Sequence, residues 1–218
     1  VTHGRDHSLR VWKMPDELGS VALSSSMAKN LPLPTMLHEM GVNALNYCAY
    51  DMCIRNEDTP TLDGWLVIPN TLESGWIDLY HVPSQQRIIE SLGRQADIRS
   101  GTERPAIVMA LQICILRDIL WIVAGYEDGV LQAWTIPVST MEPTLVWTHK
   151  SHAESIMALS MSPTCDSVLS LGADYNIVRT ALHQEAVPHV QRIKRPGHAC
   201  ASVRWDERVC VLGGWDAC

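Results

Sequence analysis

Short apolar segments and alternating apolar and polar positions recur along the chain and predict strands. In residues 8–12 and 129–134 the alternation has a period of two, which is typical of a strand with one buried face. Almost continuous apolar runs come just before such segments and predict strands at residues 65–68, 120–124, 168–171 and 209–212. We also expect inner strands at residues 42–50, 107–116, 156–161 and 199–205, and outer strands at residues 34–39, 87–92, 144–149 and 190–194. The pattern predicts an all-β fold.

A recurring Gly-x-Asp turn separates these strands. It occurs at residues 4–6, 172–174 and 214–216, with one extra residue at 125–128 and with Ser74 replacing the Asp in a weaker copy. An Asp side chain can accept backbone N–H groups in a tight turn, and glycine permits backbone conformations that larger residues resist. In two copies a tryptophan, Trp12 or Trp134, follows the Asp by six residues. The string is therefore interpreted as one structural unit that repeats.

The spacing of the turns predicts a propeller. The equivalent positions 6, 74, 128, 174 and 216 are 68, 54, 46 and 42 residues apart. A four-stranded propeller blade takes about 40–45 residues, so the last two intervals fit directly and the first two require loop insertions. We therefore predict a single, incomplete WD-repeat β-propeller domain over residues 1–218, with about four to five divergent four-stranded blades from a seven-bladed ring. Val1 lies inside a motif, so we expect the chain to be part of a longer one.

Two histidines support this interpretation. His152 and His198 lie between a predicted outer strand and the next inner strand, where a WD repeat has its Gly-His pair. There a histidine, a strand hydroxyl, the turn Asp and a Trp can form one buried hydrogen-bonded network. Asp174 has His152 and Ser170 available, whereas Thr180 occupies the Trp position. We expect a partial network.

Composition and charge exclude several function classes. The chain has 17 Lys and Arg against 24 Asp and Glu, a net charge of −7, which is opposite to the basic footprint of a direct nucleic-acid binder. The longest apolar stretch, residues 106–116, is shorter than the roughly 20 residues that a membrane-spanning helix needs. The seven cysteines lack paired spacing, which favours reduced thiols in the cytosol or nucleus.

No catalytic, metal or cofactor site is predicted. The turn residues Asp6, Asp128, Asp174 and Asp216 lie one per blade, too far apart to share a proton or a cation, so we interpret them as structural. The pair His149 and His152 lacks the further ligands of a zinc site. His198 and Cys200 lie at the start of a predicted inner strand, with no sign of an oxyanion hole. We interpret these histidines as structural too.

The tryptophans divide into two groups. We expect Trp12 and Trp134, at strand ends, to pack between blades. Trp76 and Trp215 each lie beside a blade turn, where an exposed aromatic ring can anchor a partner protein. They are the candidate partner contacts.

Several strings resemble one family of fungal proteins. Residues 2–6 with 9–12, residues 42–48, residues 68–70 with 77–80, and the Gly-Tyr-Glu-Asp-Gly string at 125–129 resemble the ASTRA-associated protein 1 family, in the family's order. The closing Gly-Gly-Trp-Asp-Ala at 213–217 resembles that family's last-blade turn, although Gly213 stands where Ala is common. An animal G-protein β-subunit-like WD-repeat protein is similar in the Gly-Tyr-Glu-Asp-Gly and Gly-Trp-Asp strings.

This resemblance implies a role and a set of partners. It implies a non-catalytic scaffold subunit of the nuclear ASTRA complex, with the cytoplasm as a second location. That complex is associated with chromatin remodelling and with the handling of very large kinase-related proteins. The implied partners are a Tra-type pseudokinase, TELO-type co-chaperones and RuvB-like ATPases, with no cofactor, no direct nucleic acid and no membrane.

Two alternatives differ in class. A G-protein β-like signalling adaptor would need a helical, heptad-bearing segment before Val1. A propeller enzyme would need several carboxylates or histidines on the inner strands, facing a central channel. The predicted inner strands instead offer Asn43, Asn46, Gln112 and Ser160.

Overall fold

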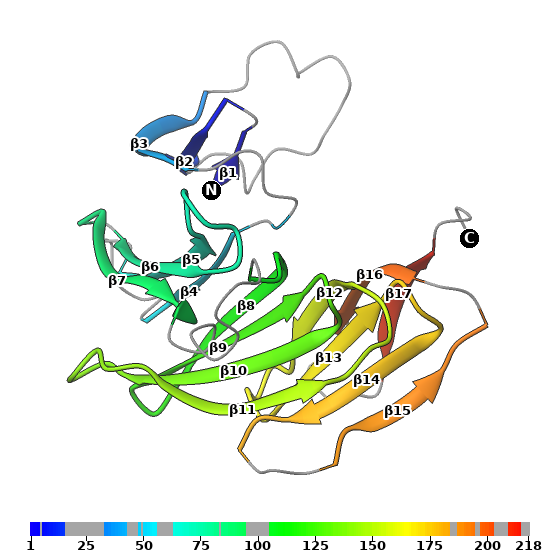
Figure 1. The fold of residues 1–218 in the computed structure, drawn as a ribbon. Coiled ribbons are helices and arrows are strands. Elements are labelled where there is room, and N and C mark those ends of the chain that lie inside the picture. The colour runs from blue at the N-terminus through cyan, green and yellow to red at the C-terminus, as the bar shows by residue number, and fades with distance from the viewer. Residues whose placement is uncertain are drawn as a thin grey trace, which may run out of the picture. The chain divides into compact units, whose positions relative to one another are not determined.

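The computed structural model describes residues 1–4, 6–15, 33–42, 48, 50–55, 63–82, 84–94, 105–183, 187–194, 197–202 and 209–214, with the backbone alone for 197–202. The chain divides into two compact units, Val1–Leu45 and Asn46–Cys218, and each is considered by itself. Seventeen strands lie in the described residues (Figure 1). The single domain expected over residues 1–218 stays a prediction.

The first unit is a three-stranded antiparallel sheet. It consists of β1 (Thr2–His3), β2 (Ser8–Lys13) and β3 (Thr35–Gly41), paired in that order. Alternation in β2 buries Leu9 and Val11, as the period of two predicted. The indole N–H of Trp12 donates to the Thr2 hydroxyl at 2.8 Å, which ties β2 to β1.

The second unit contains three four-stranded antiparallel meanders, which we call blades B, C and D. Blade B comprises β4 (Asp51–Ile54), β5 (Gly64–Pro69), β6 (Ile77–Val82) and β7 (Gln86–Leu92). Blade C comprises β8 (Val108–Leu116), β9 (Ile119–Tyr126), β10 (Val130–Pro137) and β11 (Thr144–Lys150). Blade D comprises β12 (Ile156–Met161), β13 (Ser167–Gly172), β14 (Asn176–Ala181) and β15 (His189–Arg192). In each blade the strands pair in sequence order. The first strand of blade C, β8, lies beside the first strands of the two other blades, β4 and β12.

A fourth, two-stranded sheet follows blade D. It pairs β16 (Gly197–Ser202) with β17 (Cys210–Gly214), and β16 lies beside β12 and β13. Its first strand, β16, lies beside the first strand of blade D, just as the first strand of blade D lies beside that of blade C. It therefore corresponds to the first two strands of a further blade.

Apolar side chains from neighbouring blades fill the space between them. One core cluster joins blades B and C and includes Trp65, Leu79, Ile122 and Trp134. A second cluster joins blades C and D through Trp121, Trp147, Ile156 and Leu182, among others. Sheets that bury both faces against neighbours explain the almost continuous apolar runs of the second strands, since all six residues of β5 are buried.

The predicted all-β class with repeated blades is confirmed. The strands of blades C and D lie within three residues of their predicted ends where both are defined, and β12 matches its prediction at residues 156–161. The predicted inner strand at residues 42–50 is wrong for blade B, whose first strand is Asp51–Ile54, and residues 43–47 and 49 lie outside the described part. The strand contains the partly buried Asp51, whose carboxylate accepts a backbone N–H from β8. The seven-bladed ring stays a prediction.

Candidate functional site

The turn of blade D carries a buried hydrogen-bonded network. His152, before β12, and Asp174, in the β13–β14 turn, are both buried, and His152 Nδ1 lies 3.1 Å from Asp174 Oδ1. Because an ionised carboxylate only accepts, Nδ1–H is the donor, which leaves Nε2 to accept from the Ser170 hydroxyl at 2.9 Å. The backbone N–H groups of Ala153 and Asn176 also donate to Asp174, at 3.1 and 2.9 Å. The structure thus brings together three residues that the sequence singled out.

These donors set the charge state of Asp174. Burial raises its pKa, but the hydrogen bonds from His152, Asn176 and Ala153 outweigh burial and hold the pKa below its usual value of 3.8. The carboxylate is therefore ionised at neutral pH. Its role is to hold the turn against the segment that precedes the blade.

Thr180 occupies the place of the fourth member of this network. It is fully buried in β14, and its hydroxyl has no hydrogen-bond partner among the described residues. A buried hydroxyl without a partner costs about 1–3 kcal/mol relative to its solvated state. The network is partial, as the sequence led us to expect.

The glycine of the Gly-x-Asp string leaves room for the network. A Cβ placed on Gly172 would lie 2.6 Å from His152 Nδ1, and one on Gly4 would lie 2.3 Å from Asp6 Oδ1. Both distances are shorter than any ordinary contact. Close approach of a polar side chain, not a left-handed backbone, is therefore the reason for glycine at these two positions, which corrects the conformational argument from the sequence.

The other predicted turn residues are more exposed or lie outside the described residues. Asp6 is exposed and pairs with Arg10 at 2.6 Å, and this hydrogen bond lowers the pKa of Asp6. Asp128 is exposed and accepts the N–H of Val130 at 3.0 Å. Trp215, Asp216 and the side chain of His198 lie outside the described residues.

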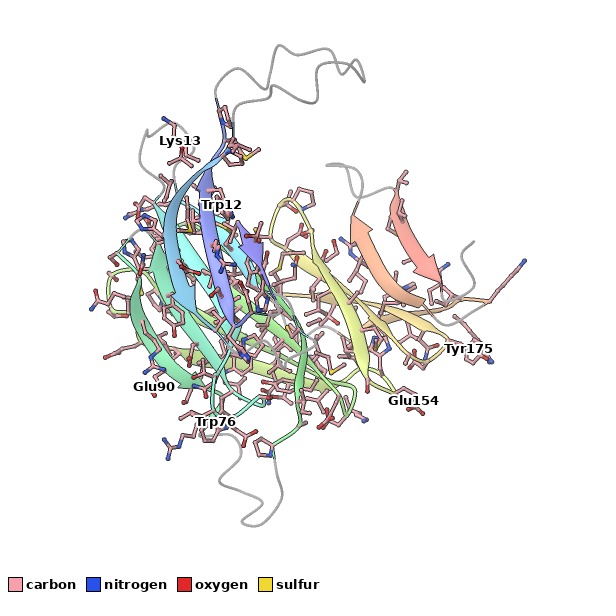
Figure 2. All side chains as sticks on the ribbon, turned by 90° about the horizontal axis from the view of Figure 1, so that it is seen from above. Trp12, Lys13, Trp76, Glu90, Glu154 and Tyr175 are labelled. Atoms are coloured by element: carbon pink, nitrogen blue, oxygen red, sulfur yellow. The ribbon has the colours of Figure 1, made fainter. Side chains whose placement is uncertain are left out.

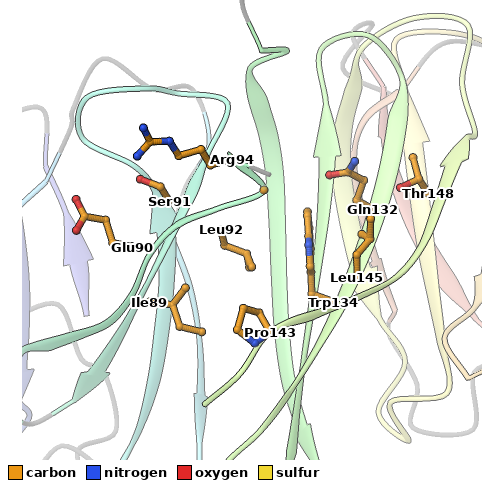
Figure 3. Close-up of a pocket in the computed structure, with 11 residues that line it drawn as sticks. Ile89, Glu90, Ser91, Leu92, Arg94, Gln132, Trp134, Pro143, Leu145 and Thr148 are labelled. Carbon is orange, nitrogen blue, oxygen red and sulfur yellow. The ribbon is translucent and has the colours of Figure 1, made fainter. Parts of the chain in front are cut away.

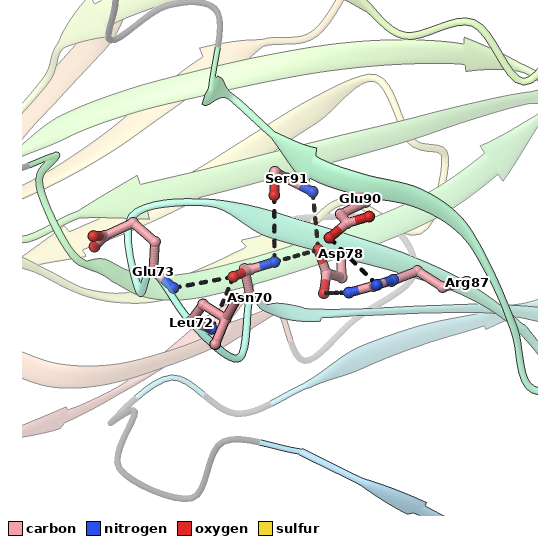
Figure 4. A network of polar contacts seen from close by, with 7 residues as sticks. All are labelled: Asn70, Leu72, Glu73, Asp78, Arg87, Glu90 and Ser91. Atoms are coloured by element: carbon pink, nitrogen blue, oxygen red, sulfur yellow. Dashed lines mark hydrogen bonds and ion pairs between the residues drawn. The ribbon is translucent and has the colours of Figure 1, made fainter.

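Blade B holds a different network, which the sequence analysis missed (Figure 4). Asp78, in β6, has no exposed surface and accepts the N–H of Ser91 at 2.9 Å and the side-chain amide of Asn70 at 2.9 Å. Arg87 pairs with the second carboxylate oxygen at 3.4 Å and with Glu90 at 3.3 Å. The carboxylate thus joins the strand, the turn before it and the strand after it.

Asn70 also organises the β5–β6 turn. Its side-chain oxygen accepts the backbone N–H groups of Leu72 and Glu73, at 2.9 and 3.0 Å. Ser74, predicted as the counterpart of the turn aspartates, instead offers its carbonyl oxygen to the N–H of Val108 at 2.9 Å. An asparagine directly after a buried strand and before a turn is the signal that could have identified this network.

The first strands of the blades are linked by side chains. Asp51 Oδ2 in β4 accepts the N–H of Ile113 in β8 at 2.7 Å, and Gln112 Oε1 in β8 accepts the N–H of Met161 in β12 at 3.0 Å. Burial raises the pKa of Asp51 above 3.8, although N–H donors from Ile113 and Met52 oppose the rise. Among the described residues of β4, β8 and β12, Asp51 is the one carboxylate, and these strands contain no histidine. The inner strand predicted at residues 42–50 did not include Asp51.

A groove of about 800 Å³ lies between the outer strands of blades B and C (Figure 3). Ile89 and Leu92 on β7 line one side, and Trp134 and Leu145 on β10 and β11 line the other. The remaining lining residues are Glu90, Ser91, Gly93, Arg94, Gln132, Pro143 and Thr148. Trp134 is buried in the cluster between these blades, and Leu145 is 44% exposed. The groove offers an apolar floor with polar groups at its margin.

Trp76 adjoins this groove through Arg94. It is half-buried in the turn that leads into β6 (Figure 2), and the guanidinium carbon of Arg94 lies 5.1 Å from the centre of its ring. Arg94 itself lines the groove. One of the two candidate partner contacts therefore lies next to this groove.

The described residues show neither a metal-binding cluster nor a membrane-spanning helix. They contain no group of three or more His, Cys, Asp or Glu side chains that could hold a metal ion. They also contain no helix with the length and apolar character to cross a membrane.

Several curated proteins are similar to this chain over its whole length. The consecutive four-stranded meanders and the buried His–Asp turn define it as a protein built of WD-repeat propeller blades. It is 31% identical over 238 residues to ASTRA-associated protein 1 of Verticillium alfalfae, 27% over 262 residues to that of Penicillium rubens, and 26% over 265 residues to that of Aspergillus niger. These alignments cover 99–100% of this chain, and the chain spans 55–58% of the relatives' length. Over its whole length the chain is similar to fungal proteins of the ASTRA-associated protein 1 family, the family that its motifs resemble.

Two further comparisons add little. No family model matches the chain. A chain from the crystal structure of the mitotic checkpoint complex is similar, with a TM-score of 0.49 and 17% identity over 70% of this chain and 41% of that one.

Proposed function

We propose that this chain is part of a non-catalytic WD-repeat scaffold and a subunit of the ASTRA complex. The observation that carries the proposal is the similarity, over the full length of the chain, to several fungal proteins named ASTRA-associated protein 1. WD-repeat blades present rigid, shaped surfaces, and function on such a scaffold resides in the grooves and loops that it positions. The two buried networks and the apolar clusters supply the rigidity.

The proposed partners are the other proteins of that assembly. They are a Tra-type pseudokinase, TELO-type co-chaperones and RuvB-like ATPases, and the proposed location is the nucleus, with the cytoplasm as a second one. The scaffold would serve chromatin remodelling and the handling of large kinase-related proteins. A net charge of −7 favours reaching chromatin through partners, because direct binding to a phosphate backbone needs basic residues.

The groove between blades B and C is the proposed contact surface. Its apolar floor, with Leu145 partly exposed beside the buried Trp134, matches the usual anatomy of an interface core. The neighbouring pair of Trp76 and Arg94 supplies residue types that are enriched where partners bind. We expect an apolar side chain of a partner protein to fill the groove.

The test is affinity purification of the tagged full-length protein from nuclear extract, with quantitative mass spectrometry of the co-eluting proteins. We expect a giant kinase-related protein and TELO-type co-chaperones in amounts comparable to the bait. Recovery of small helical γ-like or signalling partners in their place would reject the proposal in favour of a G-protein β-like adaptor.

Two matched variants test the groove in the same experiment. Leu145→Glu places a charge on the groove wall, and we expect recovery of the partners to fall at least tenfold. Val190→Glu places the same charge on the outer strand of blade D, at a residue that is 55% exposed and outside the groove. Equal recovery with both variants would reject the groove as the contact surface, whatever the partners are.

A further inference from the structure

Two cysteines from neighbouring blades lie in or against the apolar cluster that joins blades C and D. Cys114 lies in β8, and Cys165 lies in the turn between β12 and β13. The bond from the Met161 N–H to Gln112 Oε1 holds β12 against β8 at 3.0 Å. Side chains two residues apart in a strand share a face, so Cys114 lies on the same face as Gln112. Cys165 lies in the turn that follows Met161, on the side of blade D that faces Cys114.

Contacts of Trp121 and His183 connect the two cysteines from a second side. Cys114 is the register partner of Trp121 in β9, whose ring meets His183 edge-on at 4.7 Å between ring centres. His183 Nε2 lies 2.9 Å from the carbonyl oxygen of Cys165. Cys165 packs against the apolar cluster that contains Cys114 and Trp121, and the thiol of Cys114 is hydrogen-bonded to Cys165.

The two thiols differ in exposure and in acidity. Cys114 is buried, whereas Cys165 is partly exposed in a turn with a φ of 53°. The hydrogen bond that Cys114 donates stabilises the thiolate of Cys165 and lowers its pKa, while the same bond and burial raise the pKa of Cys114. Burial raises the pKa of the nearby Cys53 to about 12. Thiolate character and access favour Cys165 as the reactive sulfur.

We propose that Cys114 and Cys165 form a dithiol that hydrogen peroxide converts into a disulfide, which joins blades C and D covalently. In the first step the Cys165 thiolate attacks one oxygen of the peroxide. The O–O bond breaks, Cys165 becomes a sulfenic acid, and the departing hydroxide takes a proton and leaves as water. In the second step the sulfur of Cys114 attacks the Cys165 sulfur, the S–O bond breaks, and the hydroxide leaves as water with the Cys114 proton.

The disulfide changes what the interface between the blades can do. It closes a loop of about 50 residues between the two cysteines, and a crosslink of that span restricts the unfolded chain strongly. We expect the melting temperature of the oxidised chain to rise by on the order of 5 °C. The inference concerns the chain itself and is independent of the proposed partners.

The experiment uses the whole chain, reduced and freed of reductant, then treated with dilute hydrogen peroxide. Remaining thiols are alkylated, and the protein is digested without reduction for mass spectrometry. We expect a crosslinked peptide pair that contains Cys114 and Cys165 and that disappears on treatment with dithiothreitol. Alkylation of both cysteines to the same extent as in the untreated chain, or pairing of Cys165 with Cys53, would overturn the proposal.

Variants separate the roles of the two sulfurs. In Cys114→Ser we expect a sulfenic acid at Cys165 that a dimedone probe labels, and in Cys165→Ser we expect no oxidation of Cys114. Cys210→Ser removes an exposed thiol from outside the pair and serves as the control, with the crosslink formed as in the original chain. Dimedone labelling of Cys114 in Cys165→Ser would reverse the assignment and contradict the proposal. The crosslink in the unaltered chain tests the pair even where a variant fails to fold.

Discussion

Blades B and D each bury one aspartate near the turn between their second and third strands, but they use it differently. In blade D, Asp174 lies in the turn and holds His152, which comes before the blade's first strand. In blade B, Asp78 lies inside the third strand and binds Ser91 in the fourth strand and Asn70 at the end of the second. One carboxylate fastens a turn to an incoming segment, and the other fastens two strands to each other.

The register of the strands explains this difference. Between β6 and β7 the pairing passes from Ile77 opposite Leu92 to Leu79 opposite Ile89, so the ladder is interrupted opposite Asp78. Ser91, in this interruption, has a φ of 58°, and its N–H turns to the Asp78 carboxylate. Blade D has no such shift between its third and fourth strands, β14 and β15, and its ladder needs no side chain. A buried carboxylate thus replaces a missing backbone partner in blade B and adds to a complete ladder in blade D.

The largest expected effect follows from this replacement. Asp78→Ala leaves the Ser91 N–H and the Asn70 amide without their acceptor in a buried place, and each such loss costs about 1–3 kcal/mol. We expect the free energy of unfolding to fall by about 3 kcal/mol, measured by urea denaturation of the whole chain. Arg87, partly exposed, can turn to water and adds little.

The matched control is Asp118→Asn, which removes the charge of an exposed pair with Arg55 at 3.2 Å and suits the left-handed φ of 58° at this turn. Exposed pairs contribute about 0–1 kcal/mol, so we expect a small change. If Asp78→Ala were as mild as this control, the view that Asp78 repairs the interrupted ladder would be wrong.

The second effect concerns Asp174 and depends on pH. Asp174→Asn keeps one acceptor oxygen but replaces the other with an amide, which at Oδ2 faces donors from His152, the Ala153 N–H and the Asn176 side chain. We expect a loss of about 2 kcal/mol at neutral pH. Because the folded state lowers the pKa of Asp174, its contribution is complete above the usual value of 3.8 and is lost as the pH falls through the lower folded value.

Denaturation of the original chain and the variant across this acid range measures the prediction. The difference in unfolding free energy between them should narrow below pH 3.8. A gap that stays constant from neutral to acid pH would show that the ionised carboxylate is not what the turn requires.

The network of blade D could be predicted from the sequence, whereas that of blade B could not, because only the first has a recognisable local pattern. The pattern of blade D consists of a short string, Gly172 to Asp174, and a histidine at the usual distance before it. This pattern was sufficient to predict the network. Asp78 lies in an alternating strand with no distinctive neighbours, and its burial follows from the interruption opposite it, which the sequence does not display. The first strand of blade B was misplaced because the predicted apolar segment stopped before the charged Asp51. Its bond to Ile113 comes from another blade, and local pattern contains no trace of such a contact.

A third effect has the opposite sign. Thr180→Val replaces a buried hydroxyl that has no partner among the described residues with a methyl group of similar size. We expect the free energy of unfolding to rise by about 1 kcal/mol. Thr144→Val, at an exposed position on β11, is the control and should change little. A loss of stability with Thr180→Val would mean that the hydroxyl has a partner after all.

The smallest effect tests whether blade B responds to pH in the direction opposite to blade D. Burial raises the pKa of Asp51 in the folded state, so ionisation of Asp51 costs stability as the pH rises from 3.8 through the folded value, and the cost is complete above that. Asp51→Asn keeps an oxygen to accept the Ile113 N–H and removes the charge. We expect a gain of less than about 1 kcal/mol at neutral pH that disappears below pH 3.8, measured by denaturation beside Asp174→Asn. The difference in unfolding free energy between Asp174→Asn and the original chain closes in the same acid range, but there it begins as a loss of stability. The two variants should therefore approach the stability of the original chain from opposite directions. A loss of stability with Asp51→Asn at neutral pH would instead show that the negative charge strengthens the bond between β4 and β8 by more than its burial costs.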